Sequence, residues 1–158
     1  MKPKNCCFAG HGRIDAYTED DGVIEKRVYD KCEELITLCG VTEFWVGSYG
    51  HFDGLCSKTV RTLQIKYSGI TLYKVLPYLT KDFIRYKDLY ESKCDGFIMA
   101  DIPDNTPKRY RIIKCNQFMV DSSDYLISYI NYSFGGAYTT FTYANRKKHI
   151  KVYNFGSL

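Results

Sequence analysis

The sequence predicts an α/β fold, a Rossmann-like three-layer α/β/α sandwich with a mostly parallel sheet. Three observations predict it. Short apolar runs alternate along the chain with amphipathic segments of about a dozen residues, as in βαβ units. Low-complexity segments, internal repeats and Pro/Gly/Ser linkers are absent, so residues 1–158 are expected to form one domain. Right-handed crossovers would place helices on both faces of the sheet.

The first strand and helix are predicted from an apolar run and from helical periodicity. Residues 5–9 (NCCFA) form a short buried-strand candidate that ends at Gly10. Residues 23–39 place apolar side chains on one helical face and charged side chains on the other, and Gly40 is a typical helix end. The apolar face consists of Ile24, Val28, Cys32, Leu35, Ile36 and Cys39.

The remaining elements repeat this alternation. Residues 43–48 (EFWVGS) predict the second strand, and 53–68 predict a helix that ends near Gly69. Pro107 is compatible with the first turn of another helix, because proline lacks the N–H that a helix start leaves unpaired. The other expected elements are strands or extended runs at 70–77, 96–100, 125–130 and 150–155, and helices at 107–119 and 136–148.

Composition excludes several classes of protein. Lys and Arg number 22 against 18 Asp and Glu, a net charge of +4, which suits a small anion or a nucleotide better than duplex DNA. No apolar run approaches the ~20 residues of a membrane span, and the N-terminal run is too short for a signal peptide. The seven cysteines lie mostly in apolar runs without paired CxxC units, so we expect reduced thiols in a cytoplasmic protein, without a metal or a cofactor.

Three predicted strand-to-helix loops contain glycine where the chain leaves a strand. They are residues 9–15 (AGHGRID), 47–53 (GSYGHFD) and 131–140 (NYSFGGAYTT). Unpaired N–H groups and the helix dipole at such a loop can hold a phosphate without a charged side chain. In open α/β sheets, ligands bind at the carboxyl ends of the strands. A set of ordinary tight turns is the alternative explanation for the glycines.

Polar side chains within these loops suit a nucleotide. Arg13 and Arg61 can pair with phosphate, and Ser48 and Thr139 can donate hydroxyls. Asp53 either caps its helix or accepts a bond from a ribose hydroxyl.

Rings and amides supply further candidates. His11 is either a ligand contact or a surface hydrogen bonder, and Tyr49, Phe52 or Tyr138 could stack on a base or form part of the core. A second polar constellation lies at 114–130, where the amide of Asn116 can donate and accept. Asp121 belongs to the same constellation, with a polar turn as its alternative role.

Taken in order, these motifs resemble the SLOG superfamily over residues 5 to about 155, most closely its small stand-alone bacterial members. The resemblance rests on "CCFAGHGRI", "FWVGSYGHFDGLCSKTVRTL", "VLPYL", "KCNQFMVDSSDYLISYI" and "FGGAYTTFTYANRKKHIKVYNF". The superfamily includes DprA, the LOG-type phosphoribohydrolases and the sensor domains of Thoeris-type anti-phage systems. It implies a nucleotide-binding role, frequent self-association into homo-oligomers, and ligand contacts from Gly10, His11, Gly47, Ser48, Gly50, Asp53, Asn116, Asp121, Gly135, Gly136 and Thr139, with Ala137 in the same loop.

The sequence departs from the enzymatic members of this superfamily. LOG-type hydrolases carry Gly-Gly-x-Gly-Thr-x-x-Glu, whereas this chain has Tyr138 in place of the third glycine and Thr142 in place of the glutamate. Cys115 stands where an arginine is expected, and the arginine of the first loop is displaced to Arg13. A threonine cannot act as a carboxylate general base at neutral pH.

The sequence therefore predicts binding of a nucleotide-derived small molecule, by sensing or by sequestration. An ADP-ribose-type or cyclic nucleotide signal is the candidate ligand, and no membrane partner is expected. A LOG-like nucleoside-monophosphate phosphoribohydrolase with altered catalytic residues is one alternative. DprA-like single-stranded DNA binding is the other, with the basic run at 145–151 as its one supporting feature.

Overall fold

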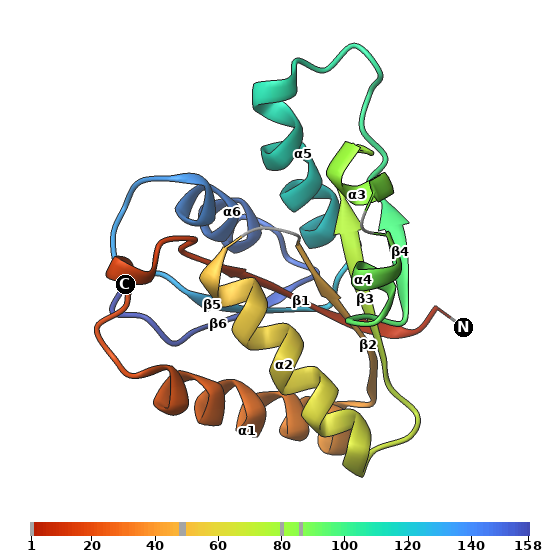
Figure 1. Ribbon diagram of the computed structural model, residues 1–158. Coiled ribbons are helices and arrows are strands. Elements are labelled where there is room, and N and C mark those ends of the chain that lie inside the picture. The colour runs from red at the N-terminus through yellow and green to blue at the C-terminus, as the bar shows by residue number, and fades with distance from the viewer. Residues whose placement is uncertain (1, 48–49, 80, 86) are drawn as a thin grey trace.

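Six parallel strands form one sheet in the order β4-β3-β2-β1-β5-β6 (Figure 1). The structure is a computed structural model that describes residues 2–47, 50–79, 81–85 and 87–158. All strand pairs are parallel, which confirms the predicted Rossmann-like fold class. The strands are β1 (Lys4–Gly10), β2 (Val41–Val46), β3 (Thr71–Leu76), β4 (Gly96–Met99), β5 (Tyr125–Tyr129) and β6 (Lys151–Asn154).

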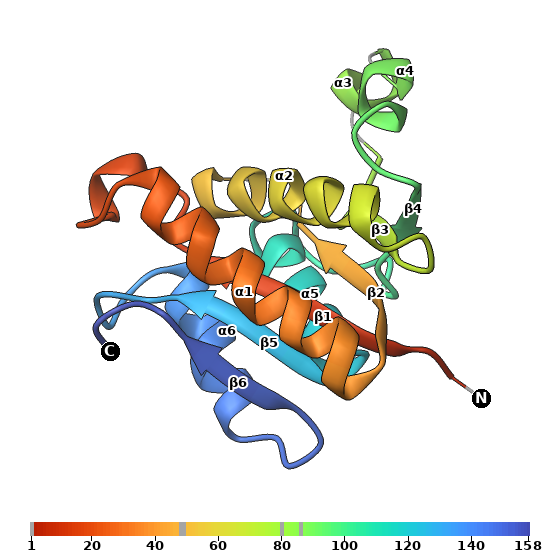
Figure 2. The ribbon, with the colours of Figure 1, turned by 90° about the horizontal axis from the view of Figure 1, so that it is seen from below.

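Helices cover both faces of this sheet. Helices α1 (Asp21–Cys39) and α2 (His51–Lys66) pack on one face, and α5 (Lys108–Asp121) and α6 (Gly136–Asn145) pack on the other (Figures 1 and 2). No helix in the described part of the chain combines the length and the apolar character that a membrane span requires. Three short helices were not predicted: the 3₁₀ helix Ile14–Ala16, α3 (Lys81–Arg85) and α4 (Lys87–Glu91).

The core consists of two apolar layers separated by the sheet. Successive side chains of β1 alternate between them, so Cys6 and Phe8 pack under α1 and α2, whereas Cys7 and Ala9 pack under α5 and α6. All seven cysteines are free thiols, and burial raises the pKa of Cys7 to about 12. These thiols therefore act as small apolar side chains within the layers.

Helix ends follow the local sequence closely. Gly40 adopts the left-handed conformation with φ of 75° and ends α1, as predicted. Pro107 precedes α5 by one residue, next to its first turn, as predicted. Helix α6 ends at Asn145 rather than at residue 148, because the chain must turn back there toward β6.

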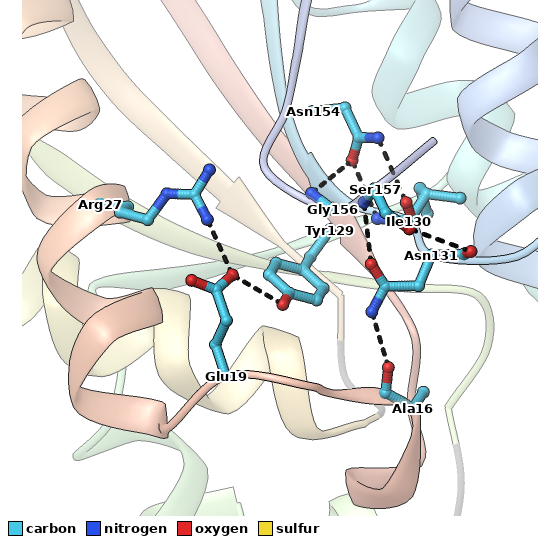
Figure 3. Close-up of polar contacts among 9 residues, drawn as sticks. All are labelled: Ala16, Glu19, Arg27, Tyr129, Ile130, Asn131, Asn154, Gly156 and Ser157. Atoms are coloured by element: carbon cyan, nitrogen blue, oxygen red, sulfur yellow. Dashed lines mark hydrogen bonds and ion pairs between the residues drawn. The ribbon is translucent and has the colours of Figure 1, made fainter.

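The ends of β5 and β6 are joined by the side chain of Asn154 (Figure 3). Its Oδ1 accepts hydrogen bonds from the N–H of Ile130 (2.9 Å) and of Gly156 (3.2 Å), and its Nδ2 donates to the carbonyl of Ile130 (3.2 Å) and of Leu158 (2.7 Å). We call these bonds the Asn154 network. They fix the last residues of the chain beside the point where β5 ends.

Replacing Asn154 by alanine is expected to destabilise the protein by about 2–3 kcal/mol, because it leaves several partly buried backbone groups unpaired. Urea unfolding followed by circular dichroism measures this change. Asn105→Ala, at an exposed loop position, is the matched control and should change the unfolding free energy by less than about 0.5 kcal/mol. Equal losses in both variants would show that the Asn154 network does not stabilise the fold.

Candidate ligand-binding site

The strand order reverses at β1, which lies between β2 and β5. At such a switch point the loops that follow neighbouring strands leave the sheet in opposite directions and open a crevice between them. A cleft of about 260 Å³ lies there, at the carboxyl ends of the strands. It is bounded by the three glycine loops, by the ends of β1 and β3, and by α5.

The cleft brings together most of the predicted binding residues. Those that line it are Gly10, His11, Gly47, Gly50, Asp53, Asn116, Gly135, Gly136 and Ala137. They come from positions as distant as 10 and 137, so the fold has gathered all three glycine loops at one place. Ser48 and Tyr49 lie outside the described residues.

The first two loops touch through their backbones. Gly50 has φ of 101°, and a Cβ added to it would lie 2.7 Å from the Cα of Gly12. The N–H of His51 donates to the carbonyl of Gly12 at 3.1 Å. Glycine at position 50 is therefore required both by conformation and by space.

Phe52 belongs to the core and not to the ligand surface. Its side chain is fully buried, and its ring contacts Tyr129 at a centroid distance of 6.3 Å. A Cβ on Gly10 would lie 2.3 Å from the same ring, so this glycine makes room for Phe52. Of the two roles predicted for Phe52, the structure supports the core role, and Tyr138 is absent from the cleft lining.

The N-termini of α2 and α6 both face the cleft. The residues preceding these helices, Gly50 and Gly135, have no side chain that could cap them. The first backbone bond of α6 runs from Thr139 to Gly135, so the N–H groups of Gly136 and Ala137 have no helical acceptor. Those two residues line the cleft, where their N–H groups and the helix dipole favour an anion.

His11 is a buried member of the cleft wall. Its Nε2 lies 2.9 Å from the backbone N of Asn131 and accepts a hydrogen bond from it. The neutral ring must then carry its proton on Nδ1, which makes Nδ1 a donor. Burial lowers the pKa of His11, so the ring is neutral at physiological pH.

The partner of His11 is itself held in place. Asn131 Nδ2 donates to the carbonyl of Ala16 at 2.8 Å, and Asn131 Oδ1 accepts from the N–H of Ser157 at 2.9 Å (Figure 3). Nearby, Glu19 accepts from the Tyr129 hydroxyl (2.9 Å) and from Arg27 (2.8 Å). The loop after β5 is thus fixed to the segment that precedes α1.

An aromatic stack extends from His11 to the surface. The Tyr132 ring lies 3.8 Å from the His11 ring at an interplanar angle of 11°, and the Phe134 ring lies 4.2 Å from Tyr132 at 24°. Phe134 is 68% exposed, which is unusual for a phenylalanine. Neither Tyr132 nor Phe134 was predicted as a site residue, although two aromatics within the four residues before a Gly-Gly pair were a usable signal.

Several predicted contacts do not lie in the cleft. The guanidinium of Arg13 is exposed and pairs with Asp15 at 3.0 Å. Asp121 lies at the C-terminal end of α5, at the opposite edge of the sheet, where it accepts from the Tyr143 hydroxyl at 2.8 Å. Thr139 donates its hydroxyl to the carbonyl of Gly135, within its own helix. Arg61 lines a second pocket, which adjoins the cleft.

Asp53 is the one charged residue among the described residues that line the cleft. An anion in the cleft would therefore be held by backbone N–H groups, while the Asp53 carboxylate could accept from sugar hydroxyls. The described residues include no group of three or more His, Cys, Asp or Glu that could hold a metal ion.

No family model matches this chain, and no curated protein sequence matches it either. Membership of the SLOG superfamily therefore stays a prediction from the motifs.

Gly50→Ala is expected to destabilise the protein by about 1–3 kcal/mol, because it combines a strained φ with a contact against Gly12. Gly54→Ala, four residues later in α2, is the matched control, since a Cβ there meets nothing within 4 Å. That control should stabilise the protein by about 0.5–1 kcal/mol, the usual gain from alanine in a helix. Urea denaturation of the two variants measures both effects, and a Gly50→Ala protein as stable as the wild type would contradict the backbone contact.

The buried His11 is expected to make stability depend on pH. Below a pH of about 6.5 the unfolded chain binds a proton at His11 that the folded chain does not, so acidification favours unfolding. His11→Gln keeps an acceptor for Asn131 but cannot titrate. Unfolding free energies at pH 7.5 and 5.5 should therefore fall more for the wild type than for the variant. Identical falls would exclude this role of His11.

Proposed function

We propose that the protein binds a nucleotide-derived small molecule in the cleft. The observation that supports this most strongly is the convergence of three glycine loops on one cavity, beside an exposed aromatic ring. Nucleotides need an anion site, a surface for a planar base and acceptors for sugar hydroxyls. The cleft lining offers candidates for the anion site and for the sugar acceptors, and Phe134, which precedes Gly135 just outside the lining, offers the surface for the base.

The anion site would be the start of α6. The N–H groups of Gly136 and Ala137 lie at a helix N-terminus that no side chain caps. Phosphate is the group that such a terminus binds in many nucleotide sites, because the N–H groups and the dipole act together. His11 could add a neutral donor through Nδ1 without bringing a charge into the wall.

The base would stack on Phe134, the last ring of the aromatic stack. One face of that ring contacts Tyr132, and 68% of the residue is accessible. Asp53 and Asn116 line the cleft from α2 and α5 and would accept bonds from sugar hydroxyls, with Asn116 also able to donate. This division of roles matches polar groups of the ligand to polar groups of the cleft.

The residues at the hydrolase positions support binding over cleavage. The Thr142 hydroxyl donates to the carbonyl of Thr139 at 3.0 Å, within α6, and supplies no carboxylate. Cys115 lines the cleft, but burial raises its pKa to about 12, so it is a neutral thiol instead of the charged arginine of the hydrolases. A sensing or sequestering role in signalling, as the SLOG resemblance suggests, fits this chemistry.

The single-stranded DNA alternative has weaker support. The basic run at 145–151 follows α6 at the edge of the sheet opposite the cleft. Within it, Lys147 lies 3.9 Å from Asp121 and over the Tyr143 ring, so part of its charge is already paired.

Nucleotide binding is tested with a panel of AMP, ADP, cyclic nucleotides and ADP-ribose, followed by thermal shift and calorimetric titration. Binding of at least one member with a dissociation constant below about 1 mM is expected. The titrated samples are then analysed chromatographically for free base. Absence of any shift across the panel would refute the proposed function, whereas catalytic release of base would establish the hydrolase alternative.

For a panel member that binds, Phe134→Ala should weaken binding by about 5- to 150-fold, the range expected for loss of one base–aromatic stack. Ribose 5-phosphate, which has no base, should bind the variant and the wild type equally. Ile65→Ala, at an exposed apolar position near the far end of α2, is the control and should not affect binding. If Phe134→Ala leaves the nucleotide affinity unchanged, the base does not stack on Phe134.

A further inference from the structure

The two edges of the sheet differ in their chemistry. At one edge, β6 begins at Lys151, directly after two further lysines at 147 and 148, and lysines on an edge strand discourage pairing with another strand. At the other edge, β4 consists of Gly96–Met99, a sequence without a charged residue or a proline. The β4 edge therefore lacks the residues that usually protect an edge strand from a further strand.

The side chains of β4 are only partly covered. Phe97 packs in the layer under α1 and α2, and the Phe83 ring of α3 contacts it at a centroid distance of 4.9 Å. Ile98 packs in the layer on the opposite face of the sheet. Both side chains are half-buried and Met99 is 48% exposed, because β4 is the last strand of the sheet on this side (Figures 1 and 2).

The backbone of β4 presents polar groups at this open edge. Leu76 of β3 pairs in register with Met99, and its carbonyl accepts from the N–H of Ala100 at 2.9 Å. The direction of the N–H and C=O groups alternates from residue to residue along a strand, so Ile98 faces β3 as Ala100 does. Phe97 and Met99 then direct their N–H and C=O groups away from β3.

We propose that two copies of the chain pair through β4, antiparallel to each other, in a dimer with twofold symmetry. An axis beside Ile98 places Phe97 opposite the partner's Met99 and Met99 opposite the partner's Phe97. Each of these pairs exchanges two hydrogen bonds, so the outward N–H and C=O groups of both copies are all used. The two sheets become one continuous sheet.

The composition of β4 favours a second copy as the occupant of this edge. An open strand edge is complemented by another extended backbone, and β4 is complementary to itself under a twofold axis. The strand is uncharged, so two copies do not repel each other through it, and the preceding Asp95 is turned toward β3, where it accepts from Leu72 and Arg61. A thioether opposite an aromatic ring, as in the Phe97–Met99 pair, is a favourable contact.

Sedimentation of the full chain without nucleotide tests the dimer. The wild type should dimerise with a dissociation constant of about 100 μM or lower, as expected for a small interface. Met99→Lys places a charge in the apolar cross-strand pair and should weaken dimerisation by about tenfold or more. Leu38→Lys is the matched control, because Leu38 is an exposed apolar residue at the end of α1, and it should leave dimerisation unchanged.

Cross-linking through residue 98 tests the register. In the proposed dimer the two copies of residue 98 form a pair without hydrogen bonds, with Cα atoms about 4.5 Å apart, which a disulfide can span. Ile98→Cys should therefore give a covalent dimer on a non-reducing gel after mild oxidation with diamide. The wild type and Leu38→Cys, treated in the same way, control for the native thiols and should run as monomers.

Three results would overturn the proposal: a wild type that stays monomeric at about 1 mM, a dimer that Met99→Lys and Leu38→Lys affect alike, or an Ile98→Cys protein that does not cross-link. Circular dichroism verifies that each variant folds, and Ile98→Cys decides the question if Met99→Lys does not. The proposed function is tested separately, because β4 contributes no residue to the described lining of the cleft.

Discussion

The contact between the backbones of Gly12 and Gly50 determines the shape of the candidate site. It draws the loop after β1 against the loop after β2, because neither residue has a side chain to separate them. The hydrogen bond from His51 to Gly12 then fixes the start of α2 relative to β1. The position of the α2 N-terminus sets the boundary between the cleft and the second pocket, so both cavities depend on this one contact.

A second layer of interactions supports the opposite wall. His11 accepts from Asn131, and Asn131 is bonded to Ala16 and Ser157. Tyr132 and Phe134 stack outward from the His11 ring. The His11 side chain, which follows β1, thus orients the loop after β5. The position of the aromatic stack therefore depends on the pairing of β1 with β5. Such preorganisation lowers the entropy cost of binding a planar ligand.

The fold could be predicted from the sequence because its signals are local. Apolar runs such as NCCFA and the periodicity of residues 23–39 depend only on neighbouring residues, and the structure follows both. Helices α3 and α4 are five residues each, too short for periodicity to appear.

The sequence predicted that the three glycine loops lie together, because parallel strands bring their carboxyl ends to one edge of the sheet. Asp121 was misplaced because α5 runs the full depth of the sheet and delivers its last residue to the other edge. The sequence left two roles open for Phe52 and predicted a ligand contact for Arg13, because the direction of each side chain depends on tertiary neighbours, Gly10 for Phe52 and Asp15 for Arg13.

The central position of β1 also determines when the cleft can exist during folding. β1 pairs on one side with β2, about forty residues later, and on the other with β5, where Asn5 contacts Asp124 across 119 positions. Bringing together residues this far apart in the sequence costs loop-closure entropy before the contact between them stabilises the chain. The loops after β1 and β2 can meet once the first half of the chain is present. The wall that contains Tyr132 and Gly136 comes from the C-terminal part of the chain and needs β5 to pair with β1, whereas the described lining of the second pocket ends at Lys93.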